Sequence, residues 1–156
     1  VYPGFKYNFT DIQSAIGLEQ IKKLNKIIKY RKYLKKIYQS NLKKLIKKKI
    51  IKLQESEKKL YSSEYIFTIL LNNKKIKFKR NDLTEYLKKK KINTTVHYIP
   101  ANKHKFYNNK FKNFNLKNSD YVYENILSVP YNNHLKKTDI IYICKHINEF
   151  ILRNSI

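Results

Sequence analysis

Apolar residues in the first third of the chain recur at helical spacing. Between Asp11 and about Lys47 they stand three or four positions apart, and no proline interrupts them. This spacing predicts one long amphipathic helix, or two helices with a bend near 23–25. The expected apolar stripe consists of Leu24, Ile28, Leu34, Ile37, Tyr38, Leu42 and Leu45.

The segment before this helix alternates between aromatic and polar residues. Pro3-Gly4 predicts a turn, and positions 5–9 then follow a period of two, which indicates an extended backbone. The aromatic side is expected to face a core. The other side carries one cation, Lys6, and one amide, Asn8.

The start of the helix is marked by a capping box. Thr10 is followed three residues later by Gln13, the spacing at which the two side chains satisfy each other's backbone N–H groups. Asp11 adds a negative charge to the first turn, where the helix dipole favours it. Taken alone, the pattern fits an ordinary capped helix preceded by a solvated loop.

The remainder alternates between short strands and helices. A transition at 48–63 leads to an apolar, β-branched run at 65–71, which predicts a buried strand turned by 72–73. Asn81 is expected to cap a helix to about Lys91. A second strand is predicted over 94–98, ended by Pro100.

The last third repeats the alternation. We expect a loop with one helical turn over 101–117, a helix capped by Ser119, and a third strand at 129–131. Thr138 is expected to cap the final helix. The buried stripe of that helix is predicted to be Ile140, Ile141, Cys144, Ile147, Phe150 and Ile151. The fold class is therefore α+β: a long N-terminal helix and then a small β-α-β-α-β-α layer with helices on one sheet face.

The chain is strongly basic. It has 156 residues, 35 Lys and Arg against 11 Asp and Glu, and a formal net charge of +24. Such a charge is typical of nucleic-acid partners, but the basic residues are spread from Lys22 to Lys145. Lys, Asn, Ile and Tyr, the enriched types, all have AT-rich codons, so base composition accounts for the bias. Nucleic acid is not the expected partner.

The residue types do not point to a disulfide, a metal site or a membrane span. The single cysteine, Cys144, excludes an internal disulfide and fits a reducing, cytoplasmic setting. The sequence has no His/Cys cluster at metal-ligand spacing, so no metal is expected. It also has no apolar run long enough to span a membrane. Because the chain begins with Val1 and contains no methionine, we expect it to be a piece of a longer protein.

Several segments, in order, resemble one protein family. Residues 4–17, with Lys6, Asn8, the capping box and Gln13-Ser14-Ala15, resemble a conserved segment of the DegT/StrS sugar aminotransferases. Further matches are 92–100, which contains Val96-His97-Tyr98-Ile99-Pro100, the pair Phe106-Tyr107, and 127–131. The resemblance covers essentially the whole chain but only the C-terminal part of the family's length.

The resemblance implies the small C-terminal domain of a fold-type-I aminotransferase. Residues 1–50 would form an interface loop and connecting helix, and residues 51–156 the small domain. The N-terminal domain that binds pyridoxal 5'-phosphate would be absent, and no lysine here lies in a segment like the family's Schiff-base motif. We therefore expect no catalytic residue in this chain and no transamination by it alone.

For the complete enzyme, the resemblance implies amino transfer from glutamate to a 4-keto nucleotide-sugar in surface polysaccharide, lipopolysaccharide or glycan biosynthesis. It implies a homodimer in which Lys6 and Asn8 contact the cofactor phosphate of the neighbouring subunit, while His97 and Tyr98 contact the sugar substrate. His97 could instead be satisfied within the fold. The chain departs from the family at Asn102, where a histidine is usual, and at 91, 93 and 95, where glycines are usual. The alternative function is a non-catalytic basic helical domain that binds nucleic acid or an acidic partner.

Overall fold

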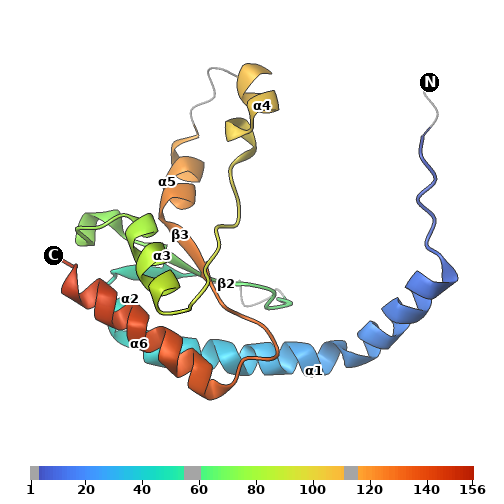
Figure 1. Cartoon of the computed structure of the whole chain (residues 1–156), viewed down its shortest axis with the longest axis horizontal. Helices are drawn as coiled ribbons and strands as arrows, with labels where there is room; N and C mark the ends of the chain where they lie inside the picture. Colours follow the sequence, from blue (N-terminus) through green and yellow to red (C-terminus); the bar gives the residue numbers. More distant parts are fainter. Residues whose placement is uncertain (1–3, 55–60, 111–115) are drawn as a thin grey trace.

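The chain folds into a three-stranded sheet covered on one face by helices (Figure 1). The computed structural model describes residues 4–54, 61–110 and 116–156. The sheet is antiparallel throughout, in the order β1 (Ile51–Leu53), β2 (Phe67–Leu71), β3 (Ile126–Val129). The α+β class predicted from the sequence is confirmed.

The long first helix forms as its spacing and cap predict. Helix α1 runs from Asp11 to Asn41, with Thr10 as its N-cap. The Thr10 N–H donates to Gln13 Oε1 at 3.0 Å, and the Gln13 N–H donates to Thr10 Oγ1 at 3.3 Å. Of the two alternatives predicted, one long helix is observed, because α1 is continuous through 23–25. It ends at Asn41, and Leu42 separates it from the short α2 (Lys43–Lys47).

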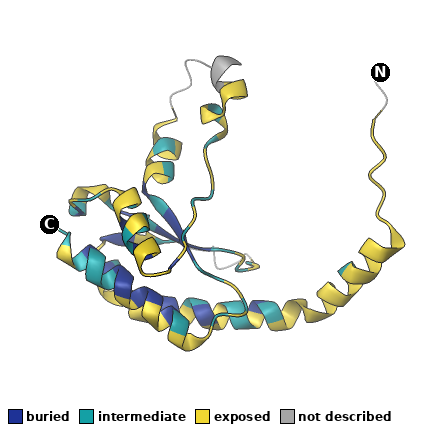
Figure 2. Ribbon diagram, viewed as in Figure 1, coloured by how far each residue is buried: buried dark blue, intermediate teal, exposed yellow. Residues whose placement is uncertain are grey.

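The helices pack on the sheet face that carries alternate strand residues. These residues are Ile51, Leu53, Phe67, Ile69, Leu71, Leu127 and Val129, and α1 reaches them through Tyr38, whose ring stacks on Phe67 at 4.5 Å. The last helix, α6 (Lys137–Arg153), lies alongside α1, and α3 (Arg80–Lys89) packs against α6. Figure 2 shows the buried residues concentrated in the sheet and on the facing sides of α1 and α6.

Hydroxyl groups tie this core to the loops around it. The buried Tyr38 hydroxyl donates to the Pro130 carbonyl at 2.7 Å, and the Tyr30 hydroxyl donates to the Leu135 carbonyl at 2.8 Å. Burial, with smaller contributions from Cys144 and Tyr131, raises the pKa of Tyr38 far above its usual value. Burial also raises the pKa of the Cys144 thiol to about 12, so the thiol is protonated at neutral pH.

The N-caps of three helices lie two or three residues before the predicted ones. Helices α3, α5 (Lys117–Asn125) and α6 begin ahead of the expected caps Asn81, Ser119 and Thr138. In α3 and α6 the reason is an aspartate in the first turn. Asp82 accepts from the Lys79 N–H and Asp139 from the Lys136 N–H, each at 2.7 Å, so those backbone groups are already satisfied.

Two strand predictions need correction, and one strand was not predicted. The sequence interpretation missed β1, because three residues in a lysine-rich stretch give little periodicity. The third strand is 126–129 rather than 129–131, since Pro130 cannot donate to the ladder. The predicted strand 94–98 is wrong: only Thr95 forms a bridge, with Ser128. In α6, Ile143 is buried where Ile141 was expected to be, and Ile141 is 41% exposed.

The loop predicted over 101–117 contains more helix than expected. It holds η2 (Ala101–Lys103) and α4 (Lys105–Lys110), and a further short turn, η1 (Asn73–Lys75), follows β2 where a turn was predicted. Residues 111–115 lie outside the described part of the chain.

Candidate functional site

The two predicted cofactor residues lie on an extended arm, residues 4–10, that precedes α1. This arm is neither helix nor strand, and it stands away from the sheet at the N-terminal end of the molecule (Figure 1). Lys6 and Asn8 are both exposed. The arm therefore presents an ammonium group and an amide to the surroundings, and both are donors that suit an anion such as a phosphate.

The aromatic side of the arm does not meet a core within the described residues. Phe5, Tyr7 and Phe9 are 86%, 84% and 75% exposed. The exposure continues along the first half of α1, whose apolar residues Ile12, Ile16, Leu18 and Ile21 are all exposed. The prediction that the aromatic side faces a core is therefore not met among the described residues. Exposed apolar side chains instead accompany Lys6 and Asn8 from the arm into α1.

The two predicted substrate residues lie together beside β3. His97 is half-buried, and its Nδ1 lies 2.7 Å from Ser128 Oγ. Tyr98 is 70% exposed, and its ring meets the His97 ring edge-on with centroids 4.7 Å apart. The structure does not bring this pair together with Lys6 and Asn8, which lie on the separate arm.

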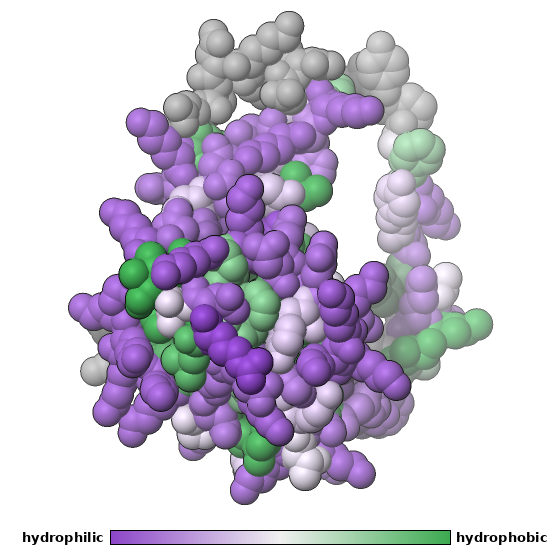
Figure 3. Space-filling model, turned by 60° about the vertical axis from the view of Figure 1, so that its left-hand side comes forward, coloured by the Kyte–Doolittle hydropathy of each residue, from purple (hydrophilic) through white to green (hydrophobic). Residues whose placement is uncertain are grey.

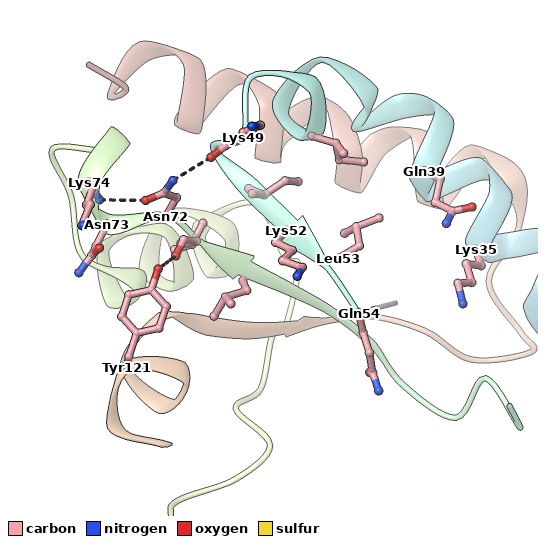
Figure 4. A pocket seen from close by; sticks show the side chains of 14 residues that line it. Lys35, Gln39, Lys49, Lys52, Leu53, Gln54, Asn72, Asn73, Lys74 and Tyr121 are labelled. Atoms are coloured by element: carbon pink, nitrogen blue, oxygen red, sulfur yellow. Dashed lines mark hydrogen bonds between the residues drawn. The ribbon is translucent and has the colours of Figure 1, made fainter. Parts of the chain in front are cut away.

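Opposite the helices, the sheet leaves a face with a hollow whose lining mixes polar and apolar side chains. One hollow of about 470 Å³ is lined by His97 together with Lys52, Thr68 and Gln54 and by apolar neighbours. Lys52 and Gln54 also line a second, larger hollow of about 1200 Å³ along β1 (Figure 4). The two hollows therefore adjoin at the exposed edge of the sheet.

The larger hollow is rich in donors. Its lining includes Lys35, Lys49, Lys52 and Lys74, the side-chain amides of Gln39, Gln54, Asn72 and Asn73, and Tyr121. Lys35 is already paired with Glu64 at 2.9 Å. Figure 4 shows Asn72 bridging the end of β2 to the Lys49 carbonyl, where its amide donates at 3.0 Å. Lys52 lies on the edge strand β1, where a lysine disfavours pairing of the strand with other chains.

Sequence reasoning did not identify the partner of His97. Ser128 stands 31 residues away in the chain, and its hydroxyl has no sequence signature of its own. The only available signal was the match at 127–131, which marked the segment but not the side chain. Lys52 and Gln54 were likewise missed, because their place beside His97 depends on β1.

A second polar cluster joins α3 to α6. His146 Nδ1 lies 3.0 Å from Glu149 Oε2, and the Tyr86 hydroxyl donates to the same carboxylate at 3.3 Å. Partial burial raises the pKa of Glu149, but the contacts with His146, together with Lys145 and the Tyr86 hydroxyl, lower it by more, so the net pKa is lowered. The three side chains hydrogen-bond to one another, which fits a structural link between the two helices.

Two kinds of feature are not found in the described part of the chain. No helix there combines the length and apolar character needed to cross a membrane. No group of three or more His, Cys, Asp or Glu side chains there is placed to hold a metal ion. Hydrophilic residues cover most of the face shown in Figure 3, in keeping with the lysines spread along the sequence.

Known proteins are similar to this chain in sequence and in fold. The family model of the DegT/DnrJ/EryC1/StrS aminotransferases matches residues 1–148. An uncharacterised protein of Methanocaldococcus jannaschii, MJ1066, is 33% identical over 97% of this chain and 39% of its own length. This chain thus spans well under half the length of that relative.

Two solved structures share the fold. Helicobacter pylori PseC, an aminotransferase involved in the biosynthesis of pseudoaminic acid, superposes with a TM-score of 0.85 at 24% identity, over 98% of this chain and 40% of PseC. Streptococcus pneumoniae Spr1654 in its PLP form, which carries the name of a sugar aminotransferase, gives 0.77 at 24% identity, over 93% and 36%. The chain belongs to the DegT/DnrJ/EryC1/StrS aminotransferase family.

Proposed function

We propose that this chain is the C-terminal part of a pyridoxal-phosphate-dependent aminotransferase that transfers an amino group from glutamate to a 4-keto nucleotide-sugar. The product would serve surface polysaccharide or glycan biosynthesis. In this proposal residues 1–50 form an interface arm and connecting helix, and residues 51–156 form the small domain. The family match over residues 1–148 supports the enzyme class.

The observation that carries the proposal is the exposed arm. Lys6 and Asn8 stand on it with no surrounding core, next to apolar side chains that are exposed from Phe5 to Ile21. An apolar surface of this kind marks a protein–protein contact. If the contact is with a second subunit, the same arm would carry a cation and an amide to the neighbouring site.

The donors on the arm fit the phosphate of pyridoxal phosphate. An ammonium and a side-chain amide supply N–H donors, and the negative phosphate accepts them. The cofactor supplies the chemistry of amino transfer when it is bound, and the covalent lysine would come from a domain outside this chain. The role of this chain would be to hold the phosphate and to contact the sugar substrate through His97 and Tyr98.

The hollows at the edge of the sheet offer donors that suit the proposed substrate. A nucleotide-sugar carries a diphosphate and many oxygen acceptors. The hollow lined by His97 offers Lys52 and Gln54 as donors, and the adjoining larger hollow offers further lysines and amides. We place the sugar nucleotide in these hollows. The basic charge of the chain then needs no nucleic-acid partner.

The test compares this chain with the longer protein in which a cofactor domain precedes it. Both are mixed with pyridoxal phosphate and glutamate, and the absorbance of bound cofactor is followed. We expect the longer protein to show a cofactor spectrum that glutamate changes, and this chain alone to show none. A longer protein that binds no cofactor, or whose spectrum is indifferent to glutamate, would refute the proposal.

The individual residues are tested in the same longer protein. Asn8→Ala should weaken cofactor retention more than it weakens folding, whereas unchanged retention would count against the phosphate contact. His97→Ala should impair the half-reaction with the sugar and leave the glutamate half-reaction nearly intact. Equal loss in both half-reactions would show that His97 is structural.

A further inference from the structure

Ser128 directs all its polar groups to one short segment. Its N–H donates to the Thr95 carbonyl at 2.8 Å, and its carbonyl accepts from the Thr95 N–H at 3.1 Å. Its hydroxyl lies 2.7 Å from His97 Nδ1. Ser128 is only 3% exposed and lies in β3, the strand that joins the sheet through β2. The His97 ring is therefore anchored to a rigid strand, although its own segment is not a strand.

The position of the proton on His97 follows from this anchor. In a neutral imidazole one ring nitrogen is a donor and the other an acceptor. If Nδ1 carried the proton, the buried Ser128 hydroxyl would accept and its own hydrogen would need another partner. Among the described residues, the hydroxyl's hydrogen bond is with His97. A buried donor left unsatisfied costs about 1–3 kcal/mol, so the arrangement in which Ser128 donates to Nδ1 is favoured.

Ser128 thereby fixes what His97 offers to a ligand. With Nδ1 occupied as an acceptor, the proton is on Nε2, which points away from Ser128 because the two nitrogens lie on different sides of the ring. His97 lines the 470 Å³ hollow on the open sheet face, with Lys52 and Gln54. A neutral histidine in this state is a hydrogen-bond donor and not a base at Nε2.

We propose that Ser128 is a positioning residue that holds His97 as the Nε2–H tautomer, so that His97 donates to an acceptor oxygen of a ligand in this hollow. We assign that oxygen to the nucleotide-sugar, an assignment that rests on the proposed function. The carboxylate of the amino donor has the same acceptor chemistry, and the two sources are distinguished by the test.

The first test does not depend on enzymatic activity. In this chain labelled with ¹⁵N-histidine, two-bond ¹H–¹⁵N correlations report the tautomer of each of the four histidines, and His97→Gln assigns the signal. We expect His97 to be the Nε2–H tautomer at a pH where it is neutral. An Nδ1–H tautomer would overturn the role of Ser128, whatever the enzyme proves to be.

Variants then separate anchoring from folding. Ser128→Ala should leave the His97 signal as a mixture of tautomers, whereas Ser128→Thr, which keeps the hydroxyl, should restore the single state. The exposed Ser119→Ala is the matched control. A Ser128→Ala chain that retains its folded spectrum and a pure Nε2–H signal would contradict the anchoring.

The ligand is tested by titrating the chain with UDP-glucose and L-glutamate. We expect UDP-glucose to shift the His97 Nε2 resonance and glutamate not to. A shift with glutamate alone, or with no probe, would overturn the assignment to the nucleotide-sugar. In the longer protein, Ser128→Ala should raise KM for the nucleotide-sugar about fivefold, the effect of one lost hydrogen bond, and leave the glutamate half-reaction unchanged.

Discussion

The two halves of α1 have the same kind of sequence and very different surroundings. In the second half, Leu34 and Tyr38 are fully buried against the sheet and α6. In the first half, Ile12 and Ile16 recur at the same helical spacing, yet they are 75% and 59% exposed (Figure 2). Hydrophobic spacing thus identifies a helix, but the surface that covers the helix depends on the rest of the fold.

The difference separates a part that folds on its own core from a part held only by local interactions. The capping box and the Lys22–Glu19 pair support the first half, and exposed pairs of this kind contribute little. The exposed half is therefore the part whose environment would change most if a second subunit bound.

Truncating one side chain in each half of α1 should affect stability very differently. Leu34→Ala removes a side chain that is 0% exposed, so we expect a loss of about 2–5 kcal/mol in the free energy of unfolding. Ile16→Ala should change it by less than about 0.5 kcal/mol, as is usual for surface positions. Urea unfolding followed by circular dichroism measures both. Comparable losses would mean that the first half of α1 has a core of its own.

A smaller effect is expected from the buried hydroxyl of Tyr38. Tyr38→Phe removes the bond to the Pro130 carbonyl and should cost about 1–2 kcal/mol, whereas Tyr33→Phe, on the half-exposed face of the same helix, should be nearly neutral. Equal stability of the two variants would show that this hydrogen bond contributes nothing.

The same substitution should also change the dependence on pH. Because burial raises the folded-state pKa of Tyr38, the unfolded phenol ionises first, near its usual pKa of 10.0. Stability should therefore fall as the pH rises above 10.0 and should fall less steeply in Tyr38→Phe. Unfolding curves at a series of alkaline pH values measure this, and identical slopes would contradict the burial of the phenol.

Loss of the N-cap should act locally. Thr10→Ala removes the acceptor of the Gln13 N–H and should destabilise the first turn by about 1 kcal/mol. We expect faster amide hydrogen exchange around Ser14 with no change in global unfolding. A global loss of stability would mean that the two halves of α1 unfold together.

The smallest effect is a gain. Gly17 lies in the exposed half of α1, and a Cβ there would meet nothing within 4 Å. Gly17→Ala should stabilise the helix locally by about 0.5–1 kcal/mol, seen as increased helicity in this chain. If the same change weakens assembly of the longer protein, a close approach by a partner backbone at Gly17 is indicated. If the helicity does not change, the higher helix propensity of alanine does not stabilise this half of α1.

Features coded by neighbouring residues could be read from the sequence. Thr10 and Gln13 located the start of α1, and the β-branched run at 65–71 located β2. Features that depend on distant pairing could not. The three residues of β1 are recognisable as a strand only beside β2, and Thr95 makes a single bridge where a full strand was predicted.

The candidate site shows the same limit. The family resemblance drew attention to Lys6, Asn8, His97 and Tyr98, but not to the contacts around them. Ser128 anchors His97 across 31 positions of chain, and Lys52 reaches the same hollow from another strand. Such neighbours follow from the antiparallel register and not from any local pattern.

In the proposed enzyme the arm with Lys6 and Asn8 acts in the site of a second subunit, and mixing two inactive variants of the longer protein tests this role. One variant lacks the covalent lysine of its cofactor domain, and the other carries Lys6→Ala and Asn8→Ala. A mixed dimer would hold one site with an intact lysine and an intact arm from the partner, so we predict that mixing restores glutamate-dependent activity. If mixing restores none while each variant still dimerises, the arm does not act across the interface and the account is wrong.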